Sequence, residues 1–390
     1  MKPKTLLLAL SLALVLPACT ANEPAPSPES SSPSSPQATD SLDYAMRAFM
    51  DQEAPAIVAE VRWPGGEWSK AYGVRHIDTK EPAQADDRIP IASVTKTMTA
   101  VSVMKLVDEG LIKLDDPVNA TLESFGVGLK PPGPITLRQL LSHTSGMPSF
   151  GEALYKTVDD LVTVSNQRLS MQRAMELTST LPWEAKAVGS LYYSDSNYIA
   201  LGLILEKLRG KTYPEILRSD IIEPLRLSKT TVDDALTNAP DLIHGYVTVR
   251  GQRMDVGVTQ EQLGSPSHGV VSTMSDVNDF LAALFGGKLV SAASLAEMQK
   301  TVVQPFGLGI ISWTEDCSGK PRYFGRGGFL DFRTIAMSSA DGRYQATMTL
   351  ASPPLATPLE DPDTDRERDL WSDQIRSALL ETLDRLCQQP

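Results

Sequence analysis

The sequence is poor in the residues that build metal sites. Its 390 residues include three cysteines and four histidines, and no His-Glu-x-x-His motif occurs. These numbers exclude a cysteine-rich zinc module and argue against a structural metal. Positive charge is also scarce, because 36 lysines and arginines face 48 aspartates and glutamates, for a net charge of −12. Such a surface repels a phosphate backbone, so we expect no nucleic-acid partner.

The apolar run at the N-terminus is too short to span a bilayer permanently. Residues 6–16 follow Met-Lys-Pro-Lys and precede Pro17-Ala18-Cys19, which is the layout of a secretory signal. Residues 16–19 resemble the lipobox of bacterial lipoproteins, which implies lipidation of Cys19 and anchorage on the outer face of the cell membrane. The alternative is an ordinary signal peptide cleaved near Ala18, with Cys19 incidental.

Beyond this signal, composition separates a linker from a folded domain. Residues 20–40 are rich in proline and serine and hold almost no bulky apolar side chain, so we expect a flexible tether. The whole chain is 42% hydrophobic and 22% charged, a composition typical of a globular protein with a large core. We expect the folded domain to span residues 41–388.

Both ends of this domain carry hairpin patterns. Residues 57–63 and 68–74 flank a Pro-Gly-Gly turn, and residues 332–338 and 344–350 flank Asp341-Gly342. Between these ends the pattern is mostly helical, and a last amphipathic helix follows residue 365. Internal helices are expected near 93–109, 137–141, 197–208 and 277–285.

This order of elements indicates an α/β fold. An antiparallel sheet would be built from both chain ends, about 41–96 and 268–388, and flanked by helices. The segment of about 97–267 would form an inserted, mostly helical part.

The tetrapeptide Ser93-Val94-Thr95-Lys96 could supply a nucleophile and its base. Residues three apart at the first turn of a helix project from one face, which makes the Ser93 hydroxyl and the Lys96 amine neighbours. A partly desolvated lysine can take the serine proton, and a helix N-terminus offers N–H groups to developing negative charge. The spacing alone is weak evidence, because an N-capping serine followed by a solvated lysine is the commoner arrangement.

Two later segments strengthen the catalytic interpretation. Tyr193 lies two residues before Asp195, just ahead of a helix, and its phenol can relay protons beside a lysine. The segment Arg326-Gly327-Gly328-Phe329 precedes a strand, where glycines admit a substrate backbone and Arg326 could hold a carboxylate. The structural alternatives are a buried aromatic with an N-capping aspartate, and a plain turn with a solvated arginine.

The three motifs occur in the order seen in penicillin-recognising serine hydrolases. The stretches IPIASVTK (89–96), ITLRQLLSHTSG (135–146) and YSDSNY (193–198) resemble the class C β-lactamase and serine D-alanyl-D-alanine carboxypeptidase family. The likeness spans about residues 43–387 and is greatest to the secreted carboxypeptidase branch. It implies the β-lactamase/transpeptidase-like fold.

Carried over position by position, the resemblance implies an acyl-enzyme mechanism that needs no cofactor. Ser93 would be the nucleophile, Lys96 its base, and Tyr193 the proton relay to the leaving group. The backbone N–H groups of Ser93 and Phe329 would form the oxyanion hole. The residues implied to contact substrate are Asp195, Arg326, Gly327 and Gly328.

Three positions depart from the family pattern. Asp195 stands where the family usually has asparagine, which removes an amide donor and can add a charge. Gly327 stands where a threonine or serine hydroxyl usually binds the substrate carboxylate, and Phe329 also replaces a hydroxyl. Arg326 could replace these contacts by a charge-assisted pair.

The leading prediction is an extracytoplasmic, lipid-anchored D-alanyl-D-alanine carboxypeptidase that acts on peptidoglycan stem peptides. A β-lactamase or an esterase of the same fold stays open, whereas the lack of a Gly-x-Ser-x-Gly motif disfavours an α/β-hydrolase. From another class, a non-catalytic penicillin-binding or wall-binding lipoprotein would keep the fold. The expected partners are a peptidoglycan peptide or β-lactam-like small molecule and a membrane, and we expect a monomer without bound metal.

The remaining cysteines and histidines have simpler interpretations. With Cys19 assigned to lipid, Cys317 and Cys387 would pair in an oxidising compartment, and members of the carboxypeptidase branch carry cysteines at similar places. Two free buried thiols are the alternative. His143 is expected to support a helix end, and His268 either lines the cleft or is purely structural.

Overall fold

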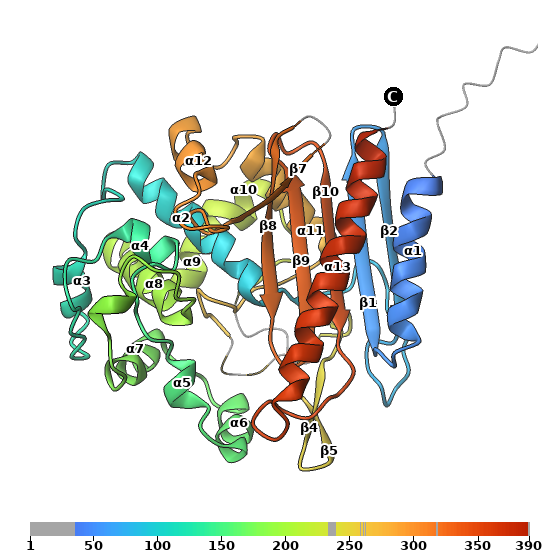
Figure 1. The fold of residues 1–390 in the computed structure, drawn as a ribbon, viewed down its shortest axis with the longest axis horizontal. Coiled ribbons are helices and arrows are strands. Elements are labelled where there is room, and N and C mark those ends of the chain that lie inside the picture. Colours follow the sequence, from blue (N-terminus) through green and yellow to red (C-terminus); the bar gives the residue numbers. More distant parts are fainter. Residues whose placement is uncertain are drawn as a thin grey trace, which may run out of the picture. The chain divides into compact units, whose positions relative to one another are not determined.

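Six antiparallel strands drawn from both ends of the chain form the central sheet (Figure 1). The computed structural model describes residues 36–388 apart from 233–238, 258, 260, 262, 317 and 318. Across the sheet the strand order is β2-β1-β10-β9-β8-β7. The strands are β1 Ala56–Trp63, β2 Gly66–Gly73, β7 Ile311–Glu315, β8 Pro321–Gly328, β9 Phe332–Ser339 and β10 Gln345–Ala351.

Both predicted hairpins are confirmed. Trp63 pairs with Gly66 across the first turn, and Gly342 in the second turn has a φ of 69°, a value that glycine adopts without strain. The two hairpins are joined by antiparallel pairing of β1 with β10, in which Ala56 lies opposite Ala351. The sheet is therefore closed by the two ends of the domain, as the α/β prediction required.

The two terminal helices cover one face of the sheet (Figure 1). They are α1 Pro36–Met50 and α13 Asp363–Cys387. Leu42 and Met46 of α1 and Ile375 of α13 are fully buried, in one apolar cluster with side chains of β1 and β10. The folded part begins at Pro36 rather than Ser41, because Ala38 in the predicted linker is already fully buried by this packing.

A second layer of helices packs on the other face and beside the sheet. The longest of these are α2 Thr95–Asp108, α8 Asp195–Arg209 and α11 Met274–Phe285. The shorter helices are α3 Asn119–Glu123, α4 Leu137–Leu141, α5 Gly151–Leu154, α6 Val158–Ser165, α7 Met171–Ser179, α9 Tyr213–Leu217, α10 Glu223–Leu225 and α12 Ala292–Gln299. Single turns of other helix types are η1 Ala92–Val94, η2 Ala185–Ala187 and η3 Arg218–Ile222.

The part predicted to be helical also contains short strands. The hairpin of β4 Tyr246–Val249 and β5 Gln252–Asp255 lies within it, and β3 Ile89–Pro90 pairs with β6 Val271–Ser272. The predicted helix at 93–109 is present, but its first turn is the 3₁₀ turn η1. Within the described residues no helix is both long enough and apolar enough to cross a membrane.

Candidate active site

The first site residue, Ser93, lies in the middle of η1, directly before α2. The backbone before this turn is fixed by a hydrogen bond that Ile91 N–H donates to Val270 O at 3.0 Å. Ala92 has a φ of +44°, in the left-handed region that non-glycine residues rarely occupy. Such strain next to a candidate nucleophile is a feature of functional sites, where the surrounding fold holds an unfavourable backbone in place.

The Lys96 amine lies at the centre of a short polar network. Its Nζ donates to Ser93 Oγ at 2.9 Å, to Asp195 Oδ1 at 2.7 Å and to Ser267 O at 2.9 Å. These three acceptors match the three N–H bonds of an ammonium group. Lys96 is only 4% exposed, so the alternative of a solvated lysine after an N-capping serine is excluded.

Charge fixes the protonation of this network. Burial alone would lower the pKa of Lys96, but the Asp195 carboxylate and then the Tyr193 phenol outweigh it and raise the pKa above its usual value. Burial would in turn raise the pKa of Asp195, but the Lys96 ammonium lowers it. The resting site therefore holds a Lys96–Asp195 ion pair, which is the consequence of having aspartate where the family usually has asparagine.

Tyr193 is held against Lys96 by His143, which lies two residues after the end of helix α4. The His143 ring stacks on the Tyr193 ring with centroids 4.2 Å apart, and Lys96 Nζ lies 5.0 Å from the Tyr193 ring centroid. His143 Nδ1 accepts a hydrogen bond from Ser194 N–H at 3.2 Å, which fixes the segment carrying Tyr193. Burial and then the Lys96 charge lower the pKa of His143 to about 3, so the ring is neutral. His143 lies at a helix end as predicted, and it also positions Tyr193, which the sequence did not indicate.

Strand β8 brings a glycine directly against the nucleophile. A Cβ at Gly327 would lie 2.3 Å from Ile91 O and 3.1 Å from Ser93 N, so any side chain there would displace the turn η1. The missing hydroxyl at position 327 is therefore a steric requirement of this strand register. A serine or threonine could not be accommodated without moving the backbone.

The register of β8 also decides which backbone N–H group faces the site. Phe329 N–H donates to Phe332 O at 3.3 Å in the hairpin that leads to β9. In an antiparallel pair hydrogen-bonded and non-hydrogen-bonded positions alternate, and Gly328 is opposite Arg333. The alternation therefore directs Gly328 N–H away from β9. Phe329 N–H as the second oxyanion donor stays a prediction, and in the structure this group makes a long hydrogen bond within the hairpin.

Two arginines stand in the strand pair β8–β9. Arg326 forms an ion pair with Asp369 of α13, so a carboxylate of the chain already compensates its charge. Arg333 of β9 is only 8% exposed, and its guanidinium donates to the carbonyl oxygens of Phe329, Phe332 and Arg368. Within the described part of the chain no carboxylate forms an ion pair with Arg333. Burial and then the Arg368 charge lower its pKa to about 10, which leaves it positive at neutral pH.

These groups line a cavity of about 620 Å³ beside the nucleophile. Ser93, Tyr193 and Asp195 are at one side of it, and Phe306 and Trp313 contribute apolar wall. The remaining charged lining includes Arg326, Arg333, Arg376, Asp365 and Asp369. A cavity with apolar walls, a few convergent polar groups and an arginine without an ion-pair partner among the described residues suits a small anionic substrate.

Arg333 was not indicated by the sequence analysis. It stands in a buried strand, and a charged residue in such a run is the only signal that could have singled it out. Gly328 was expected to contact substrate, and it lines the cavity beside Ser93.

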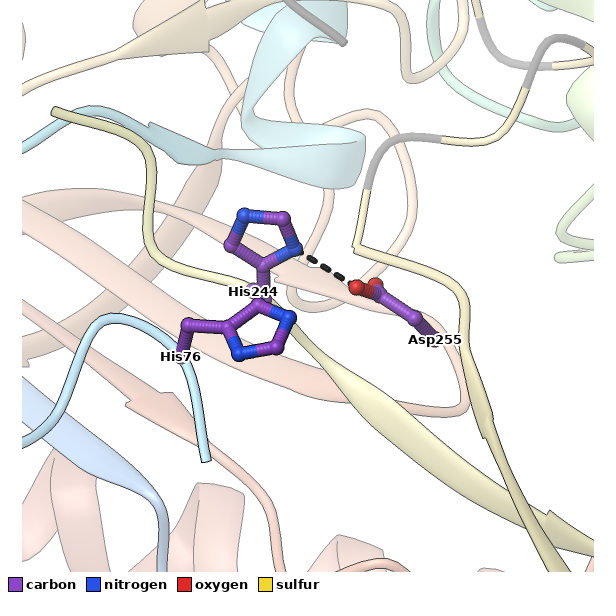
Figure 2. Close-up of side chains that lie close together, drawn as sticks. All are labelled: His76, His244 and Asp255. Carbon is purple, nitrogen blue, oxygen red and sulfur yellow. Dashed lines mark hydrogen bonds and ion pairs between the residues drawn. The ribbon is translucent and has the colours of Figure 1, made fainter. Parts of the chain in front are cut away.

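A second cluster of titratable side chains lies beside the β4–β5 hairpin. Figure 2 shows His76 and His244 turned toward Asp255, with His244 Nδ1 bonded to the Asp255 carboxylate at 2.6 Å. The possible ligand atoms lie within 4.8 Å of one another, wider than the edge of roughly 3.4 Å that zinc–nitrogen bonds of about 2.0–2.1 Å allow. His76 Nδ1 accepts from the Asp78 and Thr79 N–H groups, which leaves no proton there to orient the ring for a metal. We therefore interpret the cluster as a hydrogen-bonded His244–Asp255 pair with His76 packed edge-on against His244.

Two predictions about cysteines concern residues outside the described part of the chain. Cys19 precedes it, and Cys317 lies in one of its gaps. The lipid anchor and the disulfide between Cys317 and Cys387 accordingly stay predictions.

Fold and site together define a serine hydrolase of the kind that includes β-lactamases and penicillin-binding proteins. The chain belongs to the Beta-lactamase family, whose profile matches residues 42–368. The resemblance inferred from the motifs is thereby confirmed, as is the fold class.

Curated relatives are similar over part of their length. Protein flp of Staphylococcus aureus is 32% identical over 164 residues, which are 42% of this chain and 32% of that protein. Penicillin-binding protein 4* of Bacillus subtilis is 25% identical over 236 residues, 57% of this chain and 51% of that protein. The matches thus span about a third to a half of these relatives.

Solved structures resemble the whole fold. The D-stereospecific amidohydrolase from Streptomyces sp. has a TM-score of 0.70 at 25% identity, covering 80% of this chain and 94% of that one. The D-amino acid amidase from Ochrobactrum anthropi SV3 has a TM-score of 0.74 at 19% identity, covering 90% and 99%. The second likeness is one of fold alone.

Proposed function

We propose that the protein is a D-alanyl-D-alanine carboxypeptidase that forms an acyl-enzyme on Ser93. The observation that carries the proposal is the 2.9 Å hydrogen bond between Lys96 Nζ and Ser93 Oγ inside a buried polar network. A nucleophile within hydrogen-bond reach of a proton-transfer group, which is itself oriented by a third group, is the arrangement that nucleophilic catalysis needs.

The ion pair determines how the serine proton leaves. Lys96 is an ammonium at rest, so it must give up one proton in order to accept another. Ser93 Oγ passes its proton to Nζ while Nζ passes one to Asp195 Oδ1, along bonds of 2.9 Å and 2.7 Å. The oxygen then bonds to the substrate carbonyl carbon, and Lys96 keeps its charge throughout.

The remaining steps use groups around the same point. Negative charge on the carbonyl oxygen is met by backbone N–H groups, for which Ser93 and Phe329 are the predicted donors. As the C–N bond breaks, the leaving amine takes a proton from the Tyr193 phenol, and Asp195 returns its proton through Lys96 to the Tyr193 oxygen. The net result of acylation is that the proton of Ser93 leaves with the amine.

Arg333 supports a substrate that carries a carboxylate. Its guanidinium lies over Gly328, where an added Cβ would be 3.0 Å from Arg333 Nη1, and its charge lacks an ion-pair partner among the described residues. A C-terminal D-alanine places a carboxylate one residue from the scissile bond. A charge-assisted pair between this carboxylate and Arg333 would replace the hydroxyl contact that is missing at Gly327. Penicillins carry a carboxylate as well, so a β-lactamase is the second candidate.

Two other readings receive less support. The structural relatives include a D-amino acid amidase, but a simple amide lacks the carboxylate that Arg333 would pair with. A non-catalytic wall-binding protein has no need for the strained Ala92 or for the complete contacts of Lys96.

Intact-mass spectrometry of the protein with benzylpenicillin tests the proposal. The wild type is expected to gain the mass of one drug molecule, and Ser93→Ala is expected to gain none. A stable adduct favours the carboxypeptidase, and consumption of the drug without an adduct favours the β-lactamase. An unmodified protein and an intact drug would contradict the acyl-enzyme proposal.

The proposal includes an extracytoplasmic, lipid-anchored location. Its support is the sequence of residues 16–19 and the proline- and serine-rich segment 20–40. A tether of this composition would let the domain reach stem peptides near the membrane.

A further inference from the structure

A second, smaller cavity of about 60 Å³ also borders Ser93. Its lining includes Ser93 and Asp195 of the acylation network together with Glu261, His268 and Tyr155. One water takes roughly 15 Å³ of such space, so the cavity has room for a few. The mechanism proposed above uses none of Glu261, His268 and Tyr155.

Glu261 is a buried carboxylate that faces this cavity. It is 3% exposed, and the one ion pair it makes with described residues is to His268 Nε2, at 3.4 Å. Its carboxylate also forms a hydrogen bond with the Tyr155 side chain. Hydrogen bonds offset the loss of solvent around a buried carboxylate, and a water in the cavity would add another.

His268 connects this carboxylate to the catalytic network. Its Nδ1 is bonded to Ser267 Oγ at 2.5 Å, and the Ser267 carbonyl accepts from Lys96 Nζ at 2.9 Å. The imidazole is therefore held between Glu261 and the backbone that also fixes Lys96. Glu261 can shift little relative to Ser93 without breaking these contacts.

We propose that Glu261, positioned by His268, binds and activates the water that hydrolyses the acyl-enzyme. The inference rests on the acyl-enzyme mechanism and adds the step that completes turnover. A dedicated carboxylate for this step would speed release of the acyl group from Ser93 and so complete turnover.

In this step water hydrolyses the ester bond between the acyl group and Ser93 Oγ. The water oxygen bonds to the acyl carbon while Glu261 takes one water proton. The bond from the acyl carbon to Ser93 Oγ breaks, and Lys96 Nζ donates a proton to Oγ at 2.9 Å. The product acid ionises and returns a proton to Lys96, and Glu261 releases its proton to solvent.

Glu261→Gln separates this step from acylation. With benzylpenicillin and with a p-nitrophenyl ester, we expect acylation within about threefold of wild type and deacylation at least 100-fold slower, the scale of general-base catalysis. The acyl-enzyme should then persist in intact-mass spectra. Glu123→Gln, an exposed carboxylate at the end of α3, is the matched control and should behave as wild type.

A second measurement guards against a merely disturbed site. Hydroxylamine attacks esters without a general base, so it should discharge the Glu261→Gln acyl-enzyme at the wild-type rate. Glu261→Asp should recover part of the water reaction, because it keeps a carboxylate. Unchanged deacylation in Glu261→Gln, or equal losses of acylation and hydroxylamine discharge, would overturn the inference. Absence of any acyl-enzyme in wild type and variants alike would instead overturn the proposed function.

Discussion

Asp195 shows how one residue can redirect a mechanism that the motif spacing leaves unspecified. If the serine proton ends on Asp195, activity falls on the acid side as Asp195 protonates, and the Lys96 ammonium, which lowers the pKa of Asp195, moves this limb to lower pH. In Asp195→Asn the acceptor must be the Lys96 amine itself, which is a stronger base than a carboxylate. We expect the acid limb of kcat/KM to move to higher pH in this variant.

The opposite direction would contradict the relay. Were Lys96 the direct base in the wild type, Asp195 would raise its pKa and hold the acid limb high, and Asp195→Asn would lower the limb. Acylation rates from pH 3 to 10 for the two proteins decide between these outcomes. The ester substrate should be uncharged, so that its own titration does not enter.

Arg333 carries the prediction on substrate class. In Arg333→Gln, kcat/KM for a peptide ending in D-Ala-D-Ala is expected to fall about 30- to 100-fold, because a charge-assisted pair contributes roughly 2–3 kcal/mol. The same peptide with an amidated C-terminus should lose little further activity. Comparing acid and amide within one variant cancels any effect of Arg333 on the β8–β9 hairpin, and equal losses for both would remove the carboxylate assignment.

At the scale of elements, the end of α4 controls the loop before α8. His143 is buried and neutral with a pKa of about 3, against about 6.5 when unfolded. Below about pH 6.5 the His143 imidazole is protonated in the unfolded chain but stays neutral in the folded chain. The free energy of unfolding therefore falls as pH drops from about 6.5 toward 3. At pH 4.5 the cost is about 2–3 kcal/mol.

His143→Asn should remove this contribution while tolerating the left-handed backbone at φ 56°. Urea unfolding of both proteins at pH 4.5 and 7.5 measures it. The variant is expected to lose 2–3 kcal/mol less than wild type between the two pH values. Parallel losses would show that His143 is protonated as easily in the folded state as in the unfolded one.

The same scale shows what the sequence could predict. Alternating patterns and turn residues located both hairpins, and the apolar spacing located α13, because these signals are local. The start of α1 at Pro36 was missed, since Ala38 is buried only by tertiary packing. Ser93, Lys96 and Asp195 were predicted as site residues, but the oxyanion donor depends on a strand register that composition does not encode. The position of Glu261 beside Ser93 could not be predicted, because no motif around Glu261 in the sequence indicates it.

On the scale of the whole molecule, both ends of the domain build the site. Strand β8 comes from the C-terminal part and supplies Gly327 and Gly328, while η1 follows the N-terminal hairpin and supplies Ser93. Pairing of β1 with β10 holds these parts together. Loss of α1 should therefore affect activity through stability, whereas α13 also lines the substrate cavity through Asp369 and Arg376.

The last prediction concerns where the molecule works. A peptidoglycan hydrolase needs a location outside the cytoplasm, and thioether lipidation of Cys19 would provide it together with a tether of about 20 residues. When the full chain is expressed in a bacterium with labelled palmitate, the wild type should carry label and sediment with membranes. Cys19→Ser should lose both properties, while Cys387→Ser, the matched cysteine control, should keep them. Membrane sedimentation of an unlabelled Cys19→Ser protein would point to an uncleaved signal as the anchor, and a soluble, unlabelled wild type would show that the segment 16–19 is not lipidated.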